Sequence, residues 1–96
     1  MNYSLYKKLP HLLRKYRRAS GYSQQQVAEL LGVKSSSIIS RWEKGLCIPN
    51  VINTFKLSVV YRVMADALFI DLLRTVRLEI KENEKKYLDE KRSGNK

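Results

Sequence analysis

Residues 23–45 read SQQQVAELLGVKSSSIISRWEKG, and this stretch predicts two short helices joined by a tight glycine turn. Ser23 can cap the free N–H groups of the first helix, and Gln26, three residues later, can reach back to complete a capping box. Gly32 is expected to end that helix. Gly45 is expected just past the end of the second helix, because glycine best tolerates the left-handed conformation found there.

The apolar residues of the two helices indicate how the pair packs. In the first helix they fall on one side, and Ala28 is small enough to let a second helix cross closely. These residues are Val27, Ala28, Leu30 and Leu31. The second helix is expected to begin among Ser35 to Ser37, and its apolar contribution is Ile38, Ile39 and Trp42. Trp42 is therefore interpreted as a core residue and not as a base-stacking one. A pair of this form presents its second helix to a partner.

Charge indicates what that partner is. The chain carries a net charge of +10, and the excess belongs to its first two thirds. Residues 1–62 hold 11 Lys or Arg against 2 acidic residues, whereas residues 63–96 hold 8 against 7. A basic surface attracts a polyanion from a distance and, on contact, displaces the condensed counterions of phosphates. Nucleic acid is therefore the expected partner.

The composition excludes several other classes of protein. With 96 residues, 44% of them apolar, the chain can build one helical core. One cysteine, Cys47, and one histidine, His11, are too few for an internal disulfide or a structural zinc site, so no metal or cofactor is expected. No nucleophile–base pair or paired carboxylates suggest an enzyme, and no small-molecule ligand is evident. The start, MNYSLYKKL, lacks an apolar signal core, and charges interrupt residues 59–73, so neither export nor membrane insertion is expected.

The rest of the chain is also expected to be helical, since no strand pattern occurs. A helix over residues 10–20 is stopped by Gly21, and a helix over residues 51–61 follows the cap residue Asn50. A further helix is expected from about residue 65 to about residue 87, because no glycine or proline intervenes.

Two apolar surfaces in this C-terminal part need cover. On the helix over residues 51–61, Ile52 and Val59 form an additional stripe that one helix–helix contact would not cover. The next helix carries a seam with spacings of 4, 3, 4, 3 and 4 residues, which is typical of a heptad repeat but shorter than three clean heptads. The seam consists of Phe69, Leu73, Val76, Ile80, Asn83 and Tyr87. Docking of the part of the seam from Leu73 to Ile80 on the stripe, within a chain or across a dimer, would cover both.

The run from Leu13 through Phe69 resembles the phage-repressor and Cro-like helix-turn-helix family, also called Xre-type regulators. The most specific matching elements are GYSQQQVAELLG at residues 21–32, SRWEKG at residues 40–45 followed by Pro49, and LFIDLL at residues 68–73. The resemblance implies an all-α, five-helix repressor-like DNA-binding domain. It also implies that the second and third helices form the DNA-binding unit and that the third enters the major groove.

Three features depart from the family pattern. From Gly32 to Gly45 the chain is one residue longer, which leaves open which serine faces the groove. Arg62 replaces a usual glycine and Met64 replaces a usual Ser or Thr cap, which predicts a strained or reshaped connection at this point. Residues 74–96 lie outside the resemblance.

The resemblance also implies which residues contact DNA. Gln24 would bond a phosphate or brace the recognition helix, Arg41 would read a base, and Lys44 would contact the sugar–phosphate chain. The serines at the front of the recognition helix would face base edges and phosphates, although small hydroxyl residues there are also common helix caps. Arg17 and Glu43 match a family pair that forms a partly buried salt bridge. The expected DNA-binding residues are Gln24, Lys34, Ser35, Ser36, Ser37, Ser40, Arg41 and Lys44.

These expectations combine into a domain organisation. Residues 1–8 form an N-terminal arm, and residues 9–73 form the helix-turn-helix DNA-binding domain. Residues 74–92 form a C-terminal helical extension that is expected to act as a dimerisation segment, and residues 93–96 form a disordered tail.

The expected function is a sequence-specific regulator of transcription, a repressor, that binds double-stranded DNA. It is expected to act in the cytoplasm, at the nucleoid, as a homodimer on an operator whose half-sites lie about 34 Å apart. One alternative is an antitoxin that represses its own operon and binds a toxin through its C-terminal segment. The other is a protein-interaction adaptor, which the Ser, Lys and Arg residues at the front of the recognition helix disfavour.

Overall fold

The computed structural model describes residues 10–94 of the chain, and side chains are described for residues 12–92. This part of the chain forms six helices and no strand, which confirms the predicted all-α fold. The helices are α1 (Pro10–Ser20), α2 (Gln24–Leu31), α3 (Ser36–Lys44), α4 (Val51–Tyr61), α5 (Ala65–Leu68) and α6 (Ile70–Gly94). The expected arm at residues 1–8 lies outside the described residues, as does the side chain of His11.

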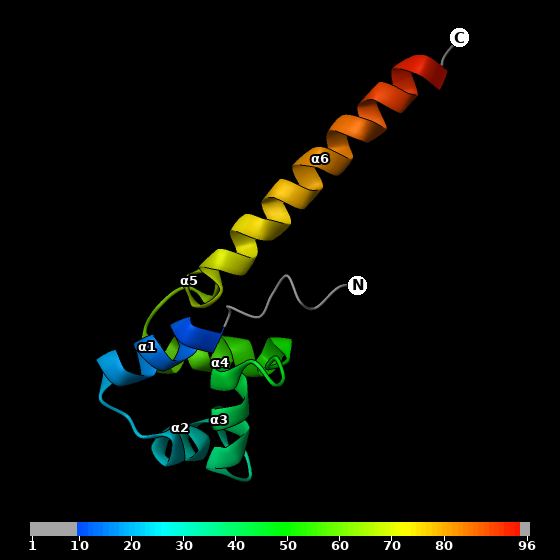
Figure 1. Ribbon diagram of the computed structural model, residues 1–96. Helices are drawn as coiled ribbons and strands as arrows, with labels where there is room; N and C mark the ends of the chain where they lie inside the picture. The colour runs from blue at the N-terminus through cyan, green and yellow to red at the C-terminus, as the bar shows by residue number, and fades with distance from the viewer. Residues whose placement is uncertain (1–9, 95–96) are drawn as a thin grey trace.

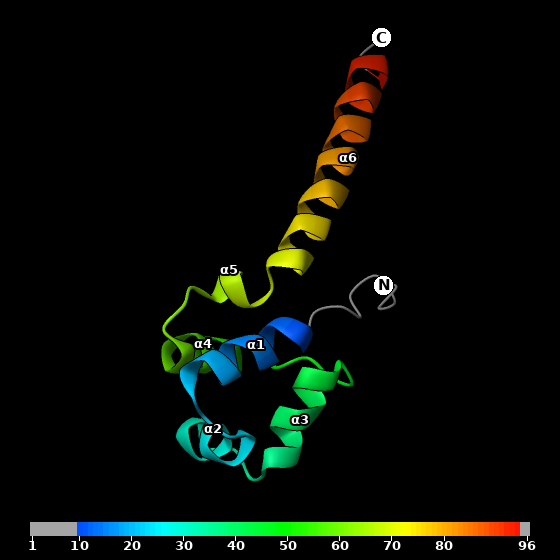
Figure 2. The same ribbon diagram turned by 60° about the vertical axis from the view of Figure 1, so that its left-hand side comes forward.

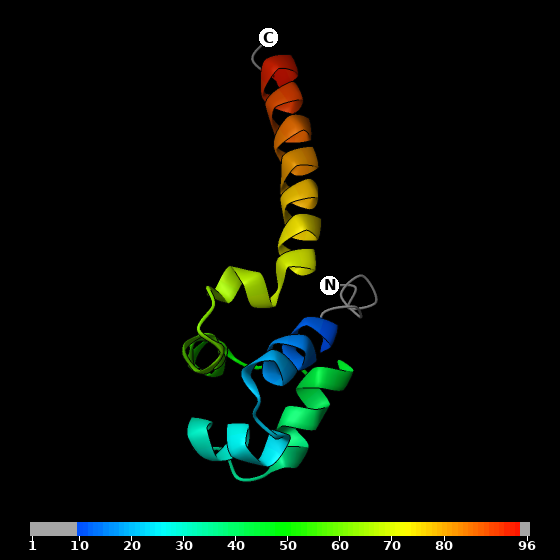
Figure 3. The same cartoon turned by 90° about the vertical axis from the view of Figure 1, so that its left-hand side faces the viewer.

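The helices divide the molecule into a body and a rod. α1 to α5 form the body, and α6 projects from it as a single long helix (Figure 1). In all three views, α2 and α3 lie at the end of the body farthest from α6 (Figure 1, Figure 2 and Figure 3). The molecule measures 61 × 24 × 20 Å as a result. No helix among residues 10–94 combines the length and apolar character that crossing a bilayer requires.

The core lies where α1 to α4 meet, and α5 closes it with Leu68. Trp42 of α3 is 5% exposed, which confirms that it is a core residue. Ala28 of α2 is 1% exposed, so it permits the close packing of α2 and α3 that its small size predicts. The buried apolar residues are Leu13, Val27, Ala28, Leu31, Ile39, Trp42, Leu57, Tyr61 and Leu68.

One apolar residue of α2 is not buried as expected. Leu30 is 55% exposed, whereas Val27 and Leu31 are almost completely buried. The reason is geometric: Val27 and Leu31 are four residues apart and share one line along α2, while Leu30 lies at the edge of this line. The neighbouring helices cover the line and leave its edge open.

The helix ends carry the predicted caps. Ser23 Oγ accepts a hydrogen bond from the Gln26 N–H at 3.1 Å, and Gln26 Oε1 accepts one from the Ser23 N–H at 2.8 Å. Gly32 and Gly45 adopt the left-handed conformation, with φ of +76° and +79°. Asn50 caps α4 through its side-chain oxygen. Local residue chemistry therefore fixes both ends of α2, the end of α3 and the start of α4.

The connection between α4 and α5 is strained, as the departures at Arg62 and Met64 predict. Arg62 ends α4 with φ of +57° and ψ of +43°, and it is the only non-glycine residue with positive φ among residues 10–94. This conformation costs an L-residue about 1–2 kcal/mol, because Cβ approaches the following carbonyl oxygen. Met64 stands at the N-cap of α5 and makes no side-chain cap hydrogen bond.

The helix expected from residue 65 to residue 87 begins at Ala65 as predicted, but it has an internal break and a later end. It is broken at Phe69, whose φ of −127° and ψ of 39° are not helical, so the four residues of α5 precede the 25 residues of α6. The break follows Leu68, which is 0% exposed, because α5 is held by the core while α6 leaves it. α6 continues to Gly94, since strong helix formers fill its last turns, and it includes two residues of the expected disordered tail.

Candidate nucleic-acid interface

The outward side of α3 carries exposed polar and charged residues. Ser37, Arg41 and Lys44 are exposed and are spaced by four and three residues, so they form one line along the helix. The opposite side of α3 is buried in the body through Ile39 and Trp42. α3 is thus anchored on one side and offers two cations and a hydroxyl on the other.

The residues at the front of α3 surround this line. Lys34 is exposed, and Ser35, Ser36 and Ser40 are partly exposed. Ser35 stands at the N-cap but forms no side-chain cap hydrogen bond, because its hydroxyl pairs with the Ser37 hydroxyl at 2.6 Å. The first N–H groups of α3 therefore receive no cap from Ser35. Free N–H groups and the positive end of a helix dipole favour a phosphate at this point.

Gln24 occupies a different place from the other expected DNA-binding residues. Its side chain is partly buried, and its Nε2 donates to Glu43 Oε1 at 3.1 Å. Of the two roles that the family resemblance implies, this contact corresponds to bracing of α3. Gln24 therefore links the start of α2 to the inner side of α3.

Glu43 is the centre of an ion-pair network beneath α3. Its side chain is 1% exposed, and Arg17 of α1 binds it with two donors: Nε to Oε2 at 2.6 Å and Nη2 to Oε1 at 3.0 Å. The third donor of Arg17, Nη1, bonds the Tyr22 carbonyl oxygen at 3.1 Å. Arg14 lies at 3.4 Å from Glu43 Oε1 and is more exposed. The pair of Arg17 and Glu43 thus joins α1 to α3, and Arg17 also joins α1 to the loop before α2.

The charge state of Glu43 follows from these contacts. Burial alone would raise the pKa of its carboxyl group, but hydrogen bonds from Arg17 and Gln24 outweigh burial and hold the pKa below its ordinary value. The hydrogen bonds that Arg17 donates to Glu43 in turn raise the pKa of Arg17. Glu43 is therefore ionised at neutral pH, and the network carries a full negative charge at its centre.

Tyr61 of α4 adds a feature that sequence reasoning missed. Tyr61 is 5% exposed, and its hydroxyl has no hydrogen-bond partner among the described residues. Burial, together with the nearby charge of Glu43, raises the pKa of this hydroxyl. No local pattern predicts this, because the sequence gives no sign that α4 ends beside the network. The position of Arg14 near Glu43, by contrast, could have been predicted from the sequence, because Arg14 precedes Arg17 by three residues and therefore lies on the same side of α1.

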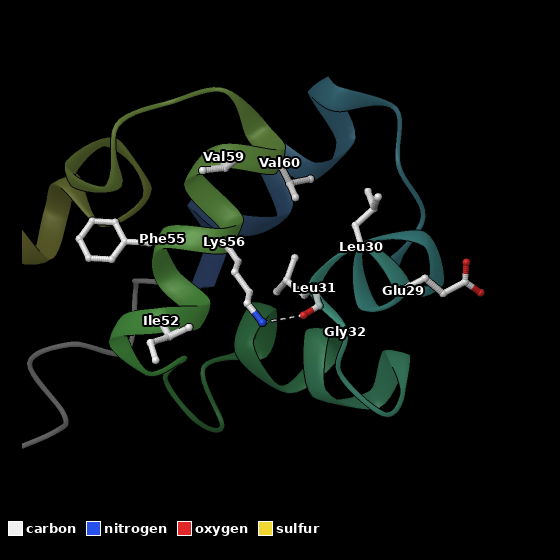
Figure 4. Close-up of a pocket in the computed structure, with 9 residues that line it drawn as sticks. All are labelled: Glu29, Leu30, Leu31, Gly32, Ile52, Phe55, Lys56, Val59 and Val60. Carbon is white, nitrogen blue, oxygen red and sulfur yellow. Dashed lines mark hydrogen bonds between the residues drawn. The ribbon is translucent and has the colours of Figure 1, made fainter.

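A second surface beside the helix pair is apolar. An open groove of about 570 Å³ lies between α2 and α4, and Figure 4 shows Lys56 reaching across it from α4. Lys56 Nζ donates to the Leu31 carbonyl oxygen at 2.9 Å, so it satisfies a free carbonyl at the end of α2. The side chains that line the groove are mainly aliphatic or aromatic. They include Leu30, Leu31, Ile52, Phe55, Val59 and Val60.

Comparisons with known proteins agree with this geometry. A helix-turn-helix family model matches residues 13–68, which are more than half of the chain. The chain is also similar to the restriction-modification controller protein C.AhdI from Aeromonas hydrophila, whose crystal structure matches with a TM-score of 0.63 and 30% sequence identity. This match covers 70% of this chain and 96% of that one. No curated protein matches the chain.

Proposed function

Because this chain belongs to the Cro/repressor-like (Xre-type) helix-turn-helix family of DNA-binding transcription regulators, we propose that it is a repressor that inserts α3 into the major groove of an operator. The observation that carries the proposal is the exposed line of Ser37, Arg41 and Lys44 on a helix whose opposite side is buried. A helix of this kind can enter the groove without losing its contacts to the body.

The residues of the interface take different roles in this proposal. Arg41 reads a base, because its planar fork can bond guanine O6 and N7 together. Lys44 and Lys34 contact phosphates, and the serines contact phosphates and base edges near the front of α3. Gln24 and the pair of Arg17 with Glu43 hold α3 at the angle that the groove requires.

The proposal includes a homodimer. A single small module buries limited surface on DNA, and two-fold related half-sites about 34 Å apart, or a multiple of that, suit a two-fold related pair of chains. Exposed apolar side chains on α4 support self-association, because the part of the chain that the structure describes does not cover them: Val51 is 71% exposed, Ile52 67% and Phe55 58%. A DNA-binding regulator of this kind works in the cytoplasm.

Selection of bound sequences from a random pool of double-stranded DNA tests the proposal. The selected sites should share a two-fold symmetric motif, and a reporter gene placed behind that motif should be expressed less when the chain is present. The variant Arg92→Ala is a matched control for Arg41→Ala, since Arg92 is an exposed arginine at the far end of α6. Recovery of no motif, or equal binding by wild type and Arg41→Ala, would contradict a base-reading α3.

Two narrower roles are supported by single observations. The match to C.AhdI supports control of restriction-modification genes, and selected sites lying upstream of such genes would establish it. The exposed α6 suits the C-terminal segment of an antitoxin, and copurification of a second small protein would identify that role. The outward Ser, Lys and Arg residues of α3 count against a pure protein-interaction adaptor.

A further inference from the structure

The outer part of α6 has no cover from the rest of the described chain. Every side chain from Arg77 to Arg92 is exposed, including Ile80 at 48% and Tyr87 at 57%. Helices in proteins are stabilised mainly by the packing of an apolar face, and isolated ones are marginal in water. α6 does not fold back onto the stripe of α4 either, since Ile52 and Val59 remain exposed. Within residues 10–94, therefore, no segment covers the outer part of the seam, and a second chain can supply this cover.

The seam determines which residues would meet in a pair of α6 helices. Two positions of a heptad form the core of a coiled coil, and the charged positions beside them contact the other helix. The core positions from residue 76 onward are Val76, which is partly exposed, and Ile80, Asn83 and Tyr87, which are exposed. The charged flanking positions are Arg77, Glu79, Glu84, Lys86 and Lys91. The signs of these charges decide how a second α6 can approach.

A parallel arrangement of two α6 helices is disfavoured by these charges. In a parallel coiled coil, a flanking residue that precedes one core position meets the residue five places further along the other helix. Glu79 would then meet Glu84 of the second copy, and Lys86 would meet Lys91. Two-fold symmetry repeats both contacts, so all four are between like charges, and like charges in contact destabilise a pair.

An antiparallel arrangement reverses the sign of these contacts. When Ile80 lies opposite Asn83 of the second copy, Val76 lies opposite Tyr87, and the seams of both helices are aligned. In this register Glu79 meets Lys86 of the second copy.

The other flank of the same antiparallel register is also complementary. Arg77 meets Glu84 of the second copy, and symmetry repeats this contact and the previous one. The same residues therefore give four attractive contacts in place of four repulsive ones. The polar Asn83 within the seam lowers the stability of such a pair but helps to fix its register.

We propose that α6 of one chain pairs with α6 of a second copy in antiparallel orientation. The consequence for DNA rests on the proposed function. α3 lies at the end of the body opposite to α6 (Figure 1 and Figure 3), so antiparallel pairing places the two DNA-binding ends at opposite ends of the assembly, facing away from each other. Such a pair joins two separate DNA segments and does not place two α3 helices on one operator. Contacts on the body, such as those of α4, are left to form the operator-bound dimer.

Charge variants measured without DNA test the orientation. In Glu84→Lys, antiparallel pairing brings the new lysine against Arg77 of the second copy, so the association constant from sedimentation equilibrium should fall about tenfold, since two symmetric contacts change sign. The double variant Arg77→Glu/Glu84→Lys restores opposite charges and should return to the wild-type constant. Glu82→Lys makes the same charge change outside the seam and flanks, and it should leave the constant unchanged. Thermal unfolding of each variant checks that the body is intact.

The outcomes separate this inference from the proposed function. Equal association constants for wild type and Glu84→Lys would overturn the pairing. A higher association constant for Glu84→Lys, which a parallel pair predicts, would overturn it as well. A bead assay with two operator duplexes, one immobilised and one fluorescent, then tests bridging. Wild-type protein should retain the fluorescent duplex on the beads. Glu84→Lys should bind each duplex separately but retain less of the fluorescent duplex on the beads. If no operator is found while the charge variants behave as expected, the pairing stands and the proposed function fails.

Discussion

Replacement of Glu43 by glutamine is the sharpest test of how α3 is held. The substitution keeps the size of the side chain but removes the charge that faces Arg17, whose side chain is 12% exposed. Removing one partner of a buried ion pair costs roughly 3–5 kcal/mol, and the small exposure of Arg17 places the expected loss near 3 kcal/mol. For a domain of this size, each kcal/mol lowers the midpoint of thermal unfolding by about 4–8 °C, so the expected fall is about 12–24 °C.

The pH dependence of stability gives the same test a second readout. The pKa of Glu43 is lower in the folded chain than its ordinary value of 4.5, so the unfolded chain binds more protons near that pH. The contribution of Glu43 to the free energy of unfolding is therefore present above pH 4.5 and is lost as the pH falls through the lower folded pKa. Glu43→Gln should lack this part of the acid dependence, which urea unfolding at several pH values measures.

The control for this prediction is Glu29→Gln, which makes the same chemical change at an exposed position of α2. Its free energy of unfolding should stay close to the wild-type value. Wild-type stability of Glu43→Gln at pH 7, or an unchanged slope of stability between pH 5 and pH 3, would refute the reasoning that the pair is buried and coupled.

Three further substitutions probe α3, the strained connection and the buried hydroxyl. Arg41→Ala should cost about 1–3 kcal/mol of operator-binding free energy and relax the preference at one base pair per half-site, whereas Lys44→Ala should weaken binding to all sequences alike and lower the slope of log affinity against log salt concentration by about 1. If Arg41→Ala instead loses affinity evenly across a panel of single-base operator variants, Arg41 contacts a phosphate and not a base. Arg62→Gly should raise the free energy of unfolding by about 0.5–1 kcal/mol because it relieves the positive φ, and Arg62→Ala, which keeps Cβ, should show no such gain in urea unfolding. Tyr61→Phe removes a buried hydroxyl without a partner and should leave the chain as stable or up to about 1 kcal/mol more stable, so a marked loss of stability would show that the hydroxyl is bonded in solution.

The features that the sequence predicts well are those set by neighbouring residues. The capping box of Ser23 and Gln26, the glycine after α3 and the Asn50 cap each depend on a few positions along the chain, and all are found in the structure. The burial of Trp42 follows in the same way from its spacing with Ile38 and Ile39. Short-range chemistry is therefore sufficient to outline the helix pair and to identify its outward side.

The features that the sequence does not predict depend on contacts between distant segments. The break at Phe69 has no glycine or proline to announce it, because it arises where α5 is held by the core and α6 is not. The exposure of Leu30 depends on how far α4 reaches over α2, which periodicity does not contain. Tyr61 lies beside Glu43 through the packing of α4, although the two lie 18 positions apart in the sequence.

The two ends of the molecule are therefore organised on different principles. At one end, the buried carboxylate of Glu43 fixes α3 to α1 and α2 through hydrogen bonds, so the residues that face outward can be replaced without loss of the scaffold. At the other end, α6 is held by few contacts and presents charges whose order along the helix favours one orientation of a second helix. Substitutions on the outer side of α3 should thus alter DNA binding without altering self-association. Substitutions on the flanks of the α6 seam should do the reverse, so the two properties can be measured independently in one set of purified variants.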